Sequence, residues 1–349
     1  MKITAVLCVR NEGAFLLDWL AHHLACGVTH VVALSNDCQD GTDALLDRLA
    51  QVAPLTHIRN DGPYNDRGIQ FTGLKLADKA EAVRDADWLL ALDIDEYVNI
   101  HTGDRTLPAL IAALPQATAI TLTWRLFGNA GVVRYADVPV TEQFTAAAPV
   151  VMHWPWRAAM FKTLYRNDGT YARLGVHRPR APDTSRLGAA RWFDGEGREL
   201  DEQFRTRRIF SQYGRSNYAL AQLNHYALGA MESYLLKADR GRAVHSDHAL
   251  GMDYWVERNW SQEEDRSILT LPGVAERRAD LAADPELARL HAEAVAWRHH
   301  RLETLLTRAP YRALFARLLM TPPSRPVPIQ AARFLAHHAS RARQSGDRD

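Results

Sequence analysis

Three carboxylates stand together at the end of an apolar run. Asp93, Asp95 and Glu96 directly follow Trp88 to Leu92 within the segment Asp-Trp-Leu-Leu-Ala-Leu-Asp-Ile-Asp-Glu-Tyr-Val, residues 87–98. Carboxylates crowded at the carboxyl end of a buried strand repel one another and are costly to desolvate. A divalent cation removes that cost, and Mg²⁺ or Mn²⁺ prefers oxygen ligands. The pattern predicts a metal site, with Asp93 and Asp95 as ligands, that holds a phosphorylated substrate. A solvated turn or a helix cap is the alternative interpretation.

Polar side chains also follow the other strands that should end at this edge. Arg10 and Glu12 come after the apolar run 3–9, and Asn36 and Asp37 come after the run 31–34. Ligands bind at the carboxyl ends of strands in open α/β sheets. These four residues are therefore candidates for contacts with a base, a ribose or a phosphate, although a helix N-terminal turn would also explain Glu12.

Two more candidates precede the acidic strand. Gln70 and Lys75 lie on the helix expected before Trp88, and either one could face a ligand or solvent.

Apolar runs and helical spacings alternate over the first hundred residues. The expected strands are 3–9, 31–34, 55–58 and 88–92, with helices over about 15–24, 40–49 and 69–83 between them. Short connections between such elements imply right-handed crossovers. The sequence predicts an α/β fold with a Rossmann-type, mostly parallel sheet flanked by helices. A further strand is expected at 119–124, and the chain is expected to turn helical from Tyr218 onward, which gives a helical C-terminal extension.

Composition places the chain among ordinary globular proteins. Of its 349 residues, 47% are hydrophobic and 24% charged, and the net charge is +1. That balance gives no electrostatic case for binding nucleic acid. No apolar stretch reaches the roughly 18 residues that a membrane span needs. We expect a cytoplasmic protein without a transmembrane segment, whose C-terminal helices could contact an acceptor, a membrane surface or a second subunit.

An ordered set of motifs resembles nucleotide-sugar glycosyltransferases of the family 2 type, with the GT-A fold, in the branch related to family 92. The set covers roughly residues 3–268. Its motifs are Val9-Arg10-Asn11-Glu12, Asp18-Trp19-Leu20-Ala21-His22-His23, Gly27-Val28, Ser35-Asn36-Asp37, Asp40-Gly41-Thr42, Asp87-Trp88, Leu92-Asp93-Ile94-Asp95-Glu96, Trp124-Arg125-Leu126-Phe127-Gly128 with Gly131, Phe161-Lys162-Thr163, Val176-His177, Asn224-His225-Tyr226, Glu232-Ser233 with Lys237, and Asp239-Arg240-Gly241.

The resemblance implies a metal-dependent glycosyltransferase. Such an enzyme moves a sugar from a nucleotide-diphosphate donor to a glycan or other hydroxyl acceptor, with Mn²⁺ or Mg²⁺ as cofactor and inversion favoured. Residues 1–230 would form the GT-A-like nucleotide-sugar-binding and catalytic domain, and residues 231–349 the helical C-terminal extension.

The same resemblance suggests roles for single residues. Asp93 and Asp95 would hold the metal on the diphosphate, and Asp37 would lie near the nucleobase. His177 or His225 would join the metal or diphosphate site. The remaining candidates are Lys237 and Arg240 as a cationic lid over the diphosphate, and Glu142 or Asp265 as the catalytic base. No clear Glu-Asp pair marks that base in this sequence.

Two other classes of protein fit part of the pattern. A haloacid dehalogenase-type phosphatase also has an apolar strand followed by Asp-x-Asp, with Asp93 as nucleophile and Asp95 as acid and base. That motif normally lies on the first strand, whereas about three strands precede it here, and Tyr97 stands where Thr or Val is expected. The second alternative is a catalytically inactive protein that binds a nucleotide sugar.

Overall fold

A mostly parallel sheet forms the centre of the molecule. The computed structural model describes residues 1–64, 68–212, 214–241 and 250–344. The strands of the sheet are β1 (Ile3–Val9), β2 (His30–Ser35), β3 (Leu55–Arg59), β4 (Trp88–Leu92), β5 (Glu96–Ile100), β6 (Ala119–Leu126), β8 (Phe161–Arg166), β11 (Trp192–Asp194) and β12 (Ala221–His225). In the described ranges, eight of them follow the order β3-β2-β1-β4-β8-β6-β12-β5, and β11 pairs with β6. Only β8 and β5 run antiparallel to their neighbours. The predicted α/β class is confirmed.

Helices connect the parallel strands of the first half. They are α1 (Gly13–Ala25), α2 (Thr42–Val52), α3 (Ile69–Ala77) and α4 (Glu81–Arg84). Gly27, with φ of 98°, ends α1 as expected, because a left-handed residue is needed there. The single helix predicted over 69–83 is wrong. Ala80 is extended between α3 and α4, and the Asp78 carboxylate accepts a hydrogen bond from the Leu174 N–H.

Alternate residues of the central strands pack into two different cores. In β4, Trp88, Leu90 and Leu92 belong to the core beneath α1 and α2, whereas Leu89 and Ala91 belong to the core beneath α3 and α4. A strand buried on both faces needs apolar residues at every position. Each fully buried side chain of this size contributes about 1.5–3 kcal/mol relative to an exposed one. The continuous apolar run read from the sequence therefore fixes β4 at the middle of the molecule.

The second half contains strands and short elements that the sequence did not reveal. Helical structure was expected from Tyr218, but β12 follows there and pairs with β6 and β5. The remaining short elements are α5 (Leu107–Ala113), α6 (Val140–Gln143), β7 (Ala146–Ala147), the 3₁₀ helix η1 (Trp156–Ala159), β9 (Tyr171–Arg173), β10 (Arg180–Pro182), α7 (Thr184–Leu187), α8 (Glu202–Thr206), β13 (Glu263–Glu264) and the 3₁₀ helix η2 (Ser267–Thr270).

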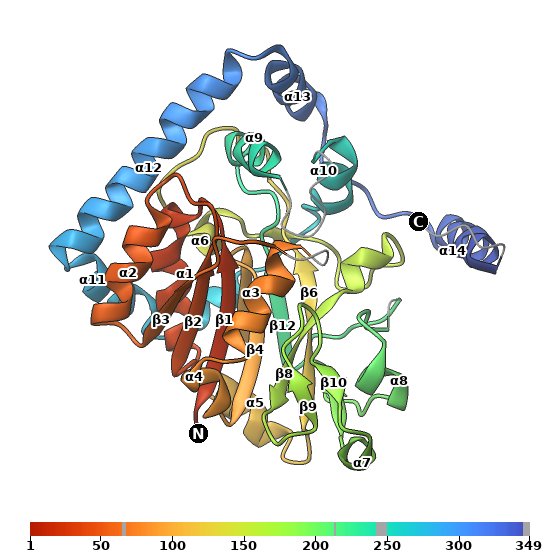
Figure 1. The fold of residues 1–349 in the computed structure, drawn as a ribbon. Coiled ribbons are helices and arrows are strands. Elements are labelled where there is room, and N and C mark those ends of the chain that lie inside the picture. The colour runs from red at the N-terminus through yellow and green to blue at the C-terminus, as the bar shows by residue number, and fades with distance from the viewer. Residues whose placement is uncertain (65–67, 213, 242–249, 345–349) are drawn as a thin grey trace.

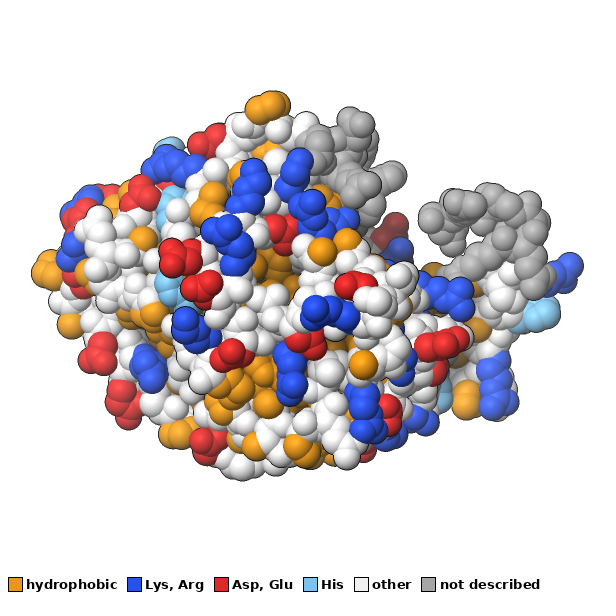
Figure 2. Space-filling model, turned by 60° about the horizontal axis from the view of Figure 1, so that its bottom comes forward, with side chains coloured by type: hydrophobic (Ala, Val, Ile, Leu, Met, Phe, Trp, Pro, Cys, Tyr) orange, Lys and Arg blue, Asp and Glu red, His pale blue; other side chains and the backbone are white. Residues whose placement is uncertain are grey.

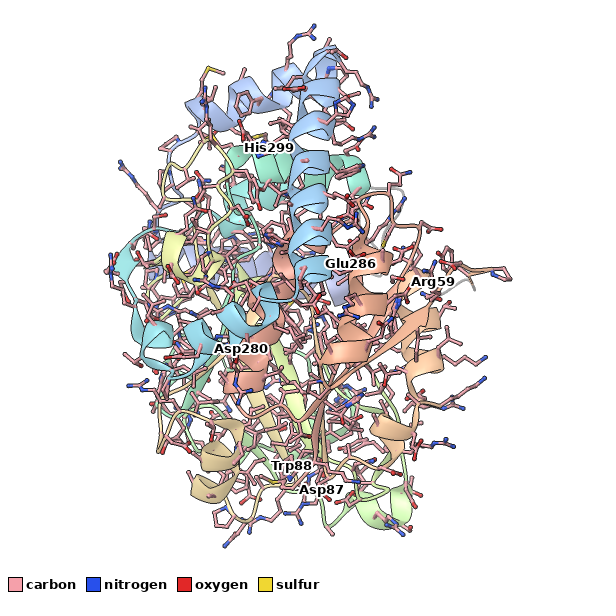
Figure 3. All side chains as sticks on the ribbon, turned by 90° about the vertical axis from the view of Figure 1, so that its left-hand side faces the viewer. Arg59, Asp87, Trp88, Asp280, Glu286 and His299 are labelled. Atoms are coloured by element: carbon pink, nitrogen blue, oxygen red, sulfur yellow. The ribbon has the colours of Figure 1, made fainter. Side chains whose placement is uncertain are left out.

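The C-terminal part is helical, as predicted. Its helices are α9 (Met231–Arg240), α10 (Met252–Arg258), α11 (Val274–Ala282), α12 (Pro285–Leu306), α13 (Ala309–Met320) and α14 (Ile329–Gln344). Figure 3 shows α12 along the side of the molecule, with Glu286 near its beginning and His299 farther along it. Helix α12 packs against α1, α2 and α9, whereas α14 stands apart from the body in Figure 1. The division into domains 1–230 and 231–349 stays a prediction.

Charges of both signs are distributed over the surface. On the face shown in Figure 2, basic and acidic side chains are interspersed, in keeping with 42 basic and 41 acidic residues in the chain. Among the described helices, none is both long and apolar enough to pass through a membrane.

Candidate active site

A cavity of about 440 Å³ lies where β1, β2 and β4 end. Helices α9 and α10 lie beyond this end of the sheet, opposite the end where β4 begins (Figure 1). Figure 3 labels Asp87 and Trp88 at that starting end. Ten residues predicted to bind metal or ligand line the cavity: Arg10, Glu12, Asn36, Gln70, Asp93, Asp95, His177, His225, Lys237 and Arg240. The fold thus brings together side chains from the first strand through α9.

Asp93 is held by an amide and a buried ammonium group. Its Oδ1 accepts a hydrogen bond from Gln70 Nε2 at 3.1 Å, and its Oδ2 accepts one from Lys162 Nζ at 3.0 Å. Lys162, on β8, is only 1% exposed and also lies 3.4 Å from Glu96. Burial alone would lower the pKa of Lys162, but Asp93 and Glu96 raise it above its ordinary value. Lys162 is therefore a permanent positive charge under the acidic motif.

Asp95 is paired with a second lysine. Lys237 Nζ, on α9, donates to Asp95 Oδ2 at 2.7 Å and to the Ala227 carbonyl at 2.7 Å. His225 Nε2 lies 3.7 Å from the same carboxylate oxygen. Although burial would raise the pKa of Asp95, Lys237 and then His225 hold it well below its ordinary value. Asp95 is an anion with its counter-charge already in place.

Glu96 supports the motif from inside the protein. Its side chain is fully buried, and its Oε1 accepts a hydrogen bond from the Trp124 indole N–H at 2.6 Å. Its Oε2 accepts one from the backbone N–H of Asp93 at 2.8 Å. Burial raises the pKa of Glu96 to about 8, against the attraction of Lys162. Glu96 thus fixes the loop that carries Asp93 and does not line the cavity itself.

The rings of both predicted histidines lie near the Trp124 ring. Ring centroids are 4.2 Å apart for Trp124 and His225, and 5.8 Å apart for Trp124 and His177. His177 Nδ1 lies 3.0 Å from the Phe161 carbonyl. Burial, followed by the charge of Lys162, lowers the pKa of His177 to about 4. Burial also lowers the pKa of His225, although Asp95 opposes that shift. Both rings are neutral near pH 7.

Arginines form the rim of the cavity. Arg240 pairs with Glu12 and donates to the Arg10 carbonyl at 2.9 Å. Arg258 stacks on Tyr254, with 3.7 Å from its guanidinium carbon to the ring centroid. The Nε atoms of Arg10 and Arg258 and the Nδ1 of His225 are buried and have no hydrogen-bond partner among the described residues. Buried polar atoms normally have partners, so these three atoms are available for hydrogen bonds to a ligand in the cavity.

The end of β2 offers a separate polar corner. Asn36 is 4% exposed and lines the cavity. Asp37 does not line it. Asp37 has a φ of 46° and accepts a hydrogen bond from the Tyr64 hydroxyl at 2.8 Å.

Three further predicted residues lie outside the cavity. Lys75 is exposed on α3. Glu142 is 57% exposed, with its nearest cation, Arg278, at 3.7 Å. Asp265 accepts hydrogen bonds from Gln222 and Ser267. Neither Glu142 nor Asp265 lines this cavity or the smaller one of about 80 Å³ beside it.

The residues do not fit a divalent metal as they stand. In the described part of the chain, no three His, Cys, Asp or Glu side chains are grouped to hold a metal ion. An ion between Asp93 and Asp95 would lie beside the ammonium groups of Lys162 and Lys237, which repel it and occupy an oxygen of each carboxylate. The sequence predicted a cation at these carboxylates, and two lysines supply that charge.

Comparisons with known proteins add little beyond this geometry. A scan against protein-family models found no match, and a search among curated proteins found none. S. aureus TarS 1-349 aligns over 87% of this chain and 83% of its own, at 14% identity and a TM-score of 0.33. In complex with UDP-GlcNAc the same protein gives 15% identity, coverages of 87% and 84%, and a TM-score of 0.32.

A third solved structure covers a smaller part of the chain. Glucosyl-3-phosphoglycerate synthase from Mycobacterium tuberculosis, in complex with Mn²⁺, UDP and glucosyl-3-phosphoglycerate, aligns over 36% of this chain and 44% of its own. Its identity is 16% and its TM-score 0.24. Scores of this size carry no functional conclusion, so the cavity itself has to support one.

Proposed function

We propose that this protein is a glycosyltransferase that moves a sugar from a nucleoside-diphosphate donor to a hydroxyl acceptor. The observation that carries the proposal is the charge of the cavity at the carboxyl ends of the strands. Its lining contains five basic side chains, Arg10, Arg157, Lys237, Arg240 and Arg258, against three acidic ones, Glu12, Asp93 and Asp95. A concave site with a basic excess favours an anionic ligand such as a diphosphate.

The polar groups suggest how a donor would lie. Asn36 and Gln70 offer neutral amides at the β2 and α3 side of the cavity, suited to a base or ribose. Arg10, Lys237 and Arg240 line the same cavity, and Arg240 donates to the Arg10 carbonyl, so a diphosphate would bind along these side chains. The sugar would then extend toward Trp124 and the two histidines, since apolar faces of sugars pack on aromatic rings.

The transfer step needs a proton acceptor. The acceptor hydroxyl oxygen forms a bond to the anomeric carbon while the bond from that carbon to the diphosphate oxygen breaks. The electron pair of the broken bond stays on the diphosphate, where Lys237 and Arg240 neutralise the developing charge. The hydroxyl proton passes to a base on the protein.

His177 is the best-placed base among the cavity side chains. A carbonyl only accepts hydrogen bonds, so His177 Nδ1 must donate to Phe161, and Nε2 of the neutral ring keeps a free lone pair. The carboxylates of the cavity are each paired with a cation: Glu12 with Arg240, Asp93 with Lys162 and Asp95 with Lys237. We therefore assign the role predicted for Glu142 or Asp265 to His177.

The finer features implied by the resemblance belong to the same proposal. They are inversion at the anomeric carbon, the relation to family 92 and a catalytic unit over residues 1–230. A peripheral membrane contact through α14 is also part of the proposal. Two apolar side chains of this helix are exposed, Phe334 at 64% and Leu335 at 37%.

Nucleotide-sugar binding tests the function. Thermal-shift screening of the whole chain against nucleotide sugars should reveal one donor class, and calorimetry should show its affinity falling at least about tenfold in Asp95→Asn. Lys75→Ala, exposed and outside the cavity, is the matched control. Failure of every nucleotide sugar to bind would refute the proposal.

Activity separates the other two classes of protein. A phosphatase would hydrolyse p-nitrophenyl phosphate and lose that activity in Asp93→Asn. A binding protein without activity would hold the donor and never consume it, even by slow hydrolysis.

A further inference from the structure

The acidic motif is already neutralised by the protein's own cations. Lys162 and Lys237 reach the motif from β8 and α9, 69 and 142 positions after the aspartates that they contact. Each ammonium nitrogen lies within 3.0 Å of a carboxylate oxygen. Lys162 is buried and Lys237 is partly buried. A lysine removed from water is stable only when it is paired, so each lysine needs the aspartate that it contacts.

The two lysines differ in their access to the cavity. Lys162 is 1% exposed and does not line the cavity, so its charge serves Asp93 and Glu96. Lys237 is 18% exposed and lines both cavities. An ammonium group has three donor hydrogens, and Lys237 uses two of them on Asp95 and the Ala227 carbonyl. No further acceptor for Lys237 is found among the described residues, so the third hydrogen can be donated to a ligand.

Two further cations line the cavity together with Lys237. The Tyr254 ring centroid lies 5.3 Å from Lys237 Nζ, and the guanidinium group of Arg258 stacks on the same ring. Arg240, one helical turn after Lys237, also lines the cavity. Three cations thus converge on one wall, and a diphosphate is the ligand whose charge they match.

We infer that Lys237, oriented by Asp95 and assisted by Arg240 and Arg258, binds the donor diphosphate directly, and that the protein binds this ligand without a divalent metal. The inference rests on the proposed function and deepens it. In place of a metal, the ammonium group neutralises the diphosphate in the bound donor and in the leaving group. Asp95 is then a positioning residue for Lys237, and the Asp-x-Asp spacing serves two lysines.

Calorimetry of the full-length protein with and without metal decides the question. UDP and GDP are titrated into protein treated with excess EDTA and into the same protein with excess MnCl₂. We expect the tighter-binding nucleotide to show affinities that agree within about twofold. Tightening of more than about tenfold by Mn²⁺ would overturn the inference and leave the proposed function intact. Absence of nucleotide binding in both conditions would overturn both.

Substitution of Lys237 adds a second measurement. In EDTA, Lys237→Met should weaken nucleotide binding by at least about 30-fold, whereas Lys237→Arg, which keeps the charge, should lose less than about fivefold. Unchanged binding by a folded Lys237→Met protein would also overturn the inference. The parent comparison needs no variant, so it stays decisive if Lys237→Met does not fold.

Discussion

Glu96 and Tyr97, consecutive residues of β5, belong to two different groups of titratable side chains. The cavity group consists of Asp93, Asp95, Glu96, Lys162 and Lys237. The α1 group consists of Asp18, His22, His23 and Tyr97. In the cavity group, opposite charges lie in direct contact, and Asp95 keeps its charge despite burial. In the α1 group, burial disfavours the charged forms: it lowers the pKa of His22 to about 4 and that of His23 well below its ordinary value, and it raises the pKa of Asp18 to about 6.

The contrast shows what marks a functional site in this fold. His22 donates a hydrogen bond to the Val98 carbonyl, and His23 donates one to the Trp19 carbonyl. Neither histidine lines either cavity. Burial alone shifts pKa values in both groups, so a perturbed pKa does not separate them. Ion pairing at the cavity does separate them, because Asp95 and Lys237 are paired there, whereas His22 and His23 line neither cavity. The two histidines belong to the core, and Tyr97 borders only the smaller cavity.

Removing a cavity-group lysine should have the largest effect on stability. Lys162→Met leaves Asp93 without its counter-charge and removes the buried partner of Glu96, so the free energy of unfolding should fall by about 3–5 kcal/mol. Urea denaturation measures the loss. Lys75→Met, exposed on α3, should change stability by less than about 0.5 kcal/mol. A loss below about 1 kcal/mol would show that the pairing is unimportant.

The α1 group should make stability depend on pH. The pKa of His22 is about 4 in the folded protein, whereas its ordinary value is 6.5. The unfolded chain therefore binds the proton first, and stability is lost as the pH falls from 6.5 to about 4. Over this pH range, the titration of His22 alone should lower the free energy of unfolding by on the order of 3 kcal/mol. His22→Gln keeps a donor for the Val98 carbonyl and cannot titrate, so denaturation across this pH range should show a flatter slope. An unchanged slope would contradict the assignment.

Within the cavity, the proposed base should affect turnover and spare binding. His177→Asn keeps a donor for the Phe161 carbonyl but has no basic nitrogen, so kcat should fall about 100-fold, or about 2.7 kcal/mol. The Kd for the nucleotide, measured by calorimetry, should change less than about threefold because the diphosphate contacts remain. A parallel loss of binding would indicate a structural role.

A carboxylate outside both groups should have the smallest effect. Glu142 is exposed and lines neither cavity, so Glu142→Gln should leave kcat within about twofold of the parent value. A fall of about 100-fold or more would return the base to Glu142 and exclude His177.

Local patterns predicted the parallel half of the fold well. The expected strands 3–9 and 88–92 match β1 and β4 at both ends, because strands buried on both faces are continuous apolar runs. The strands β8 and β12 were missed. Gln222 and Asn224 of β12 bond to each other inside the protein, so the strand contains polar residues that resemble a loop in sequence. A pairing partner far along the chain leaves no local pattern.

Lys162 stands in one of the motifs that carry the resemblance, but the sequence assigned it no role in the site. A signal was present, since this lysine stands next to Phe161 and near Leu164 and Tyr165 in the segment that forms β8. A lysine inside a strand needs a buried carboxylate. The sequence contains many carboxylates, and no pattern near Lys162 indicates that its partner is Asp93.

The sequence by itself determined where the acidic residues lie, because apolar runs set the strands and chain direction sets the edge where Asp93 and Asp95 follow β4. Only the tertiary structure decided what neutralises them. Coulomb attraction depends on distance in space, and the fold places Lys162 and Lys237 within 3.0 Å of carboxylates that are far away along the chain.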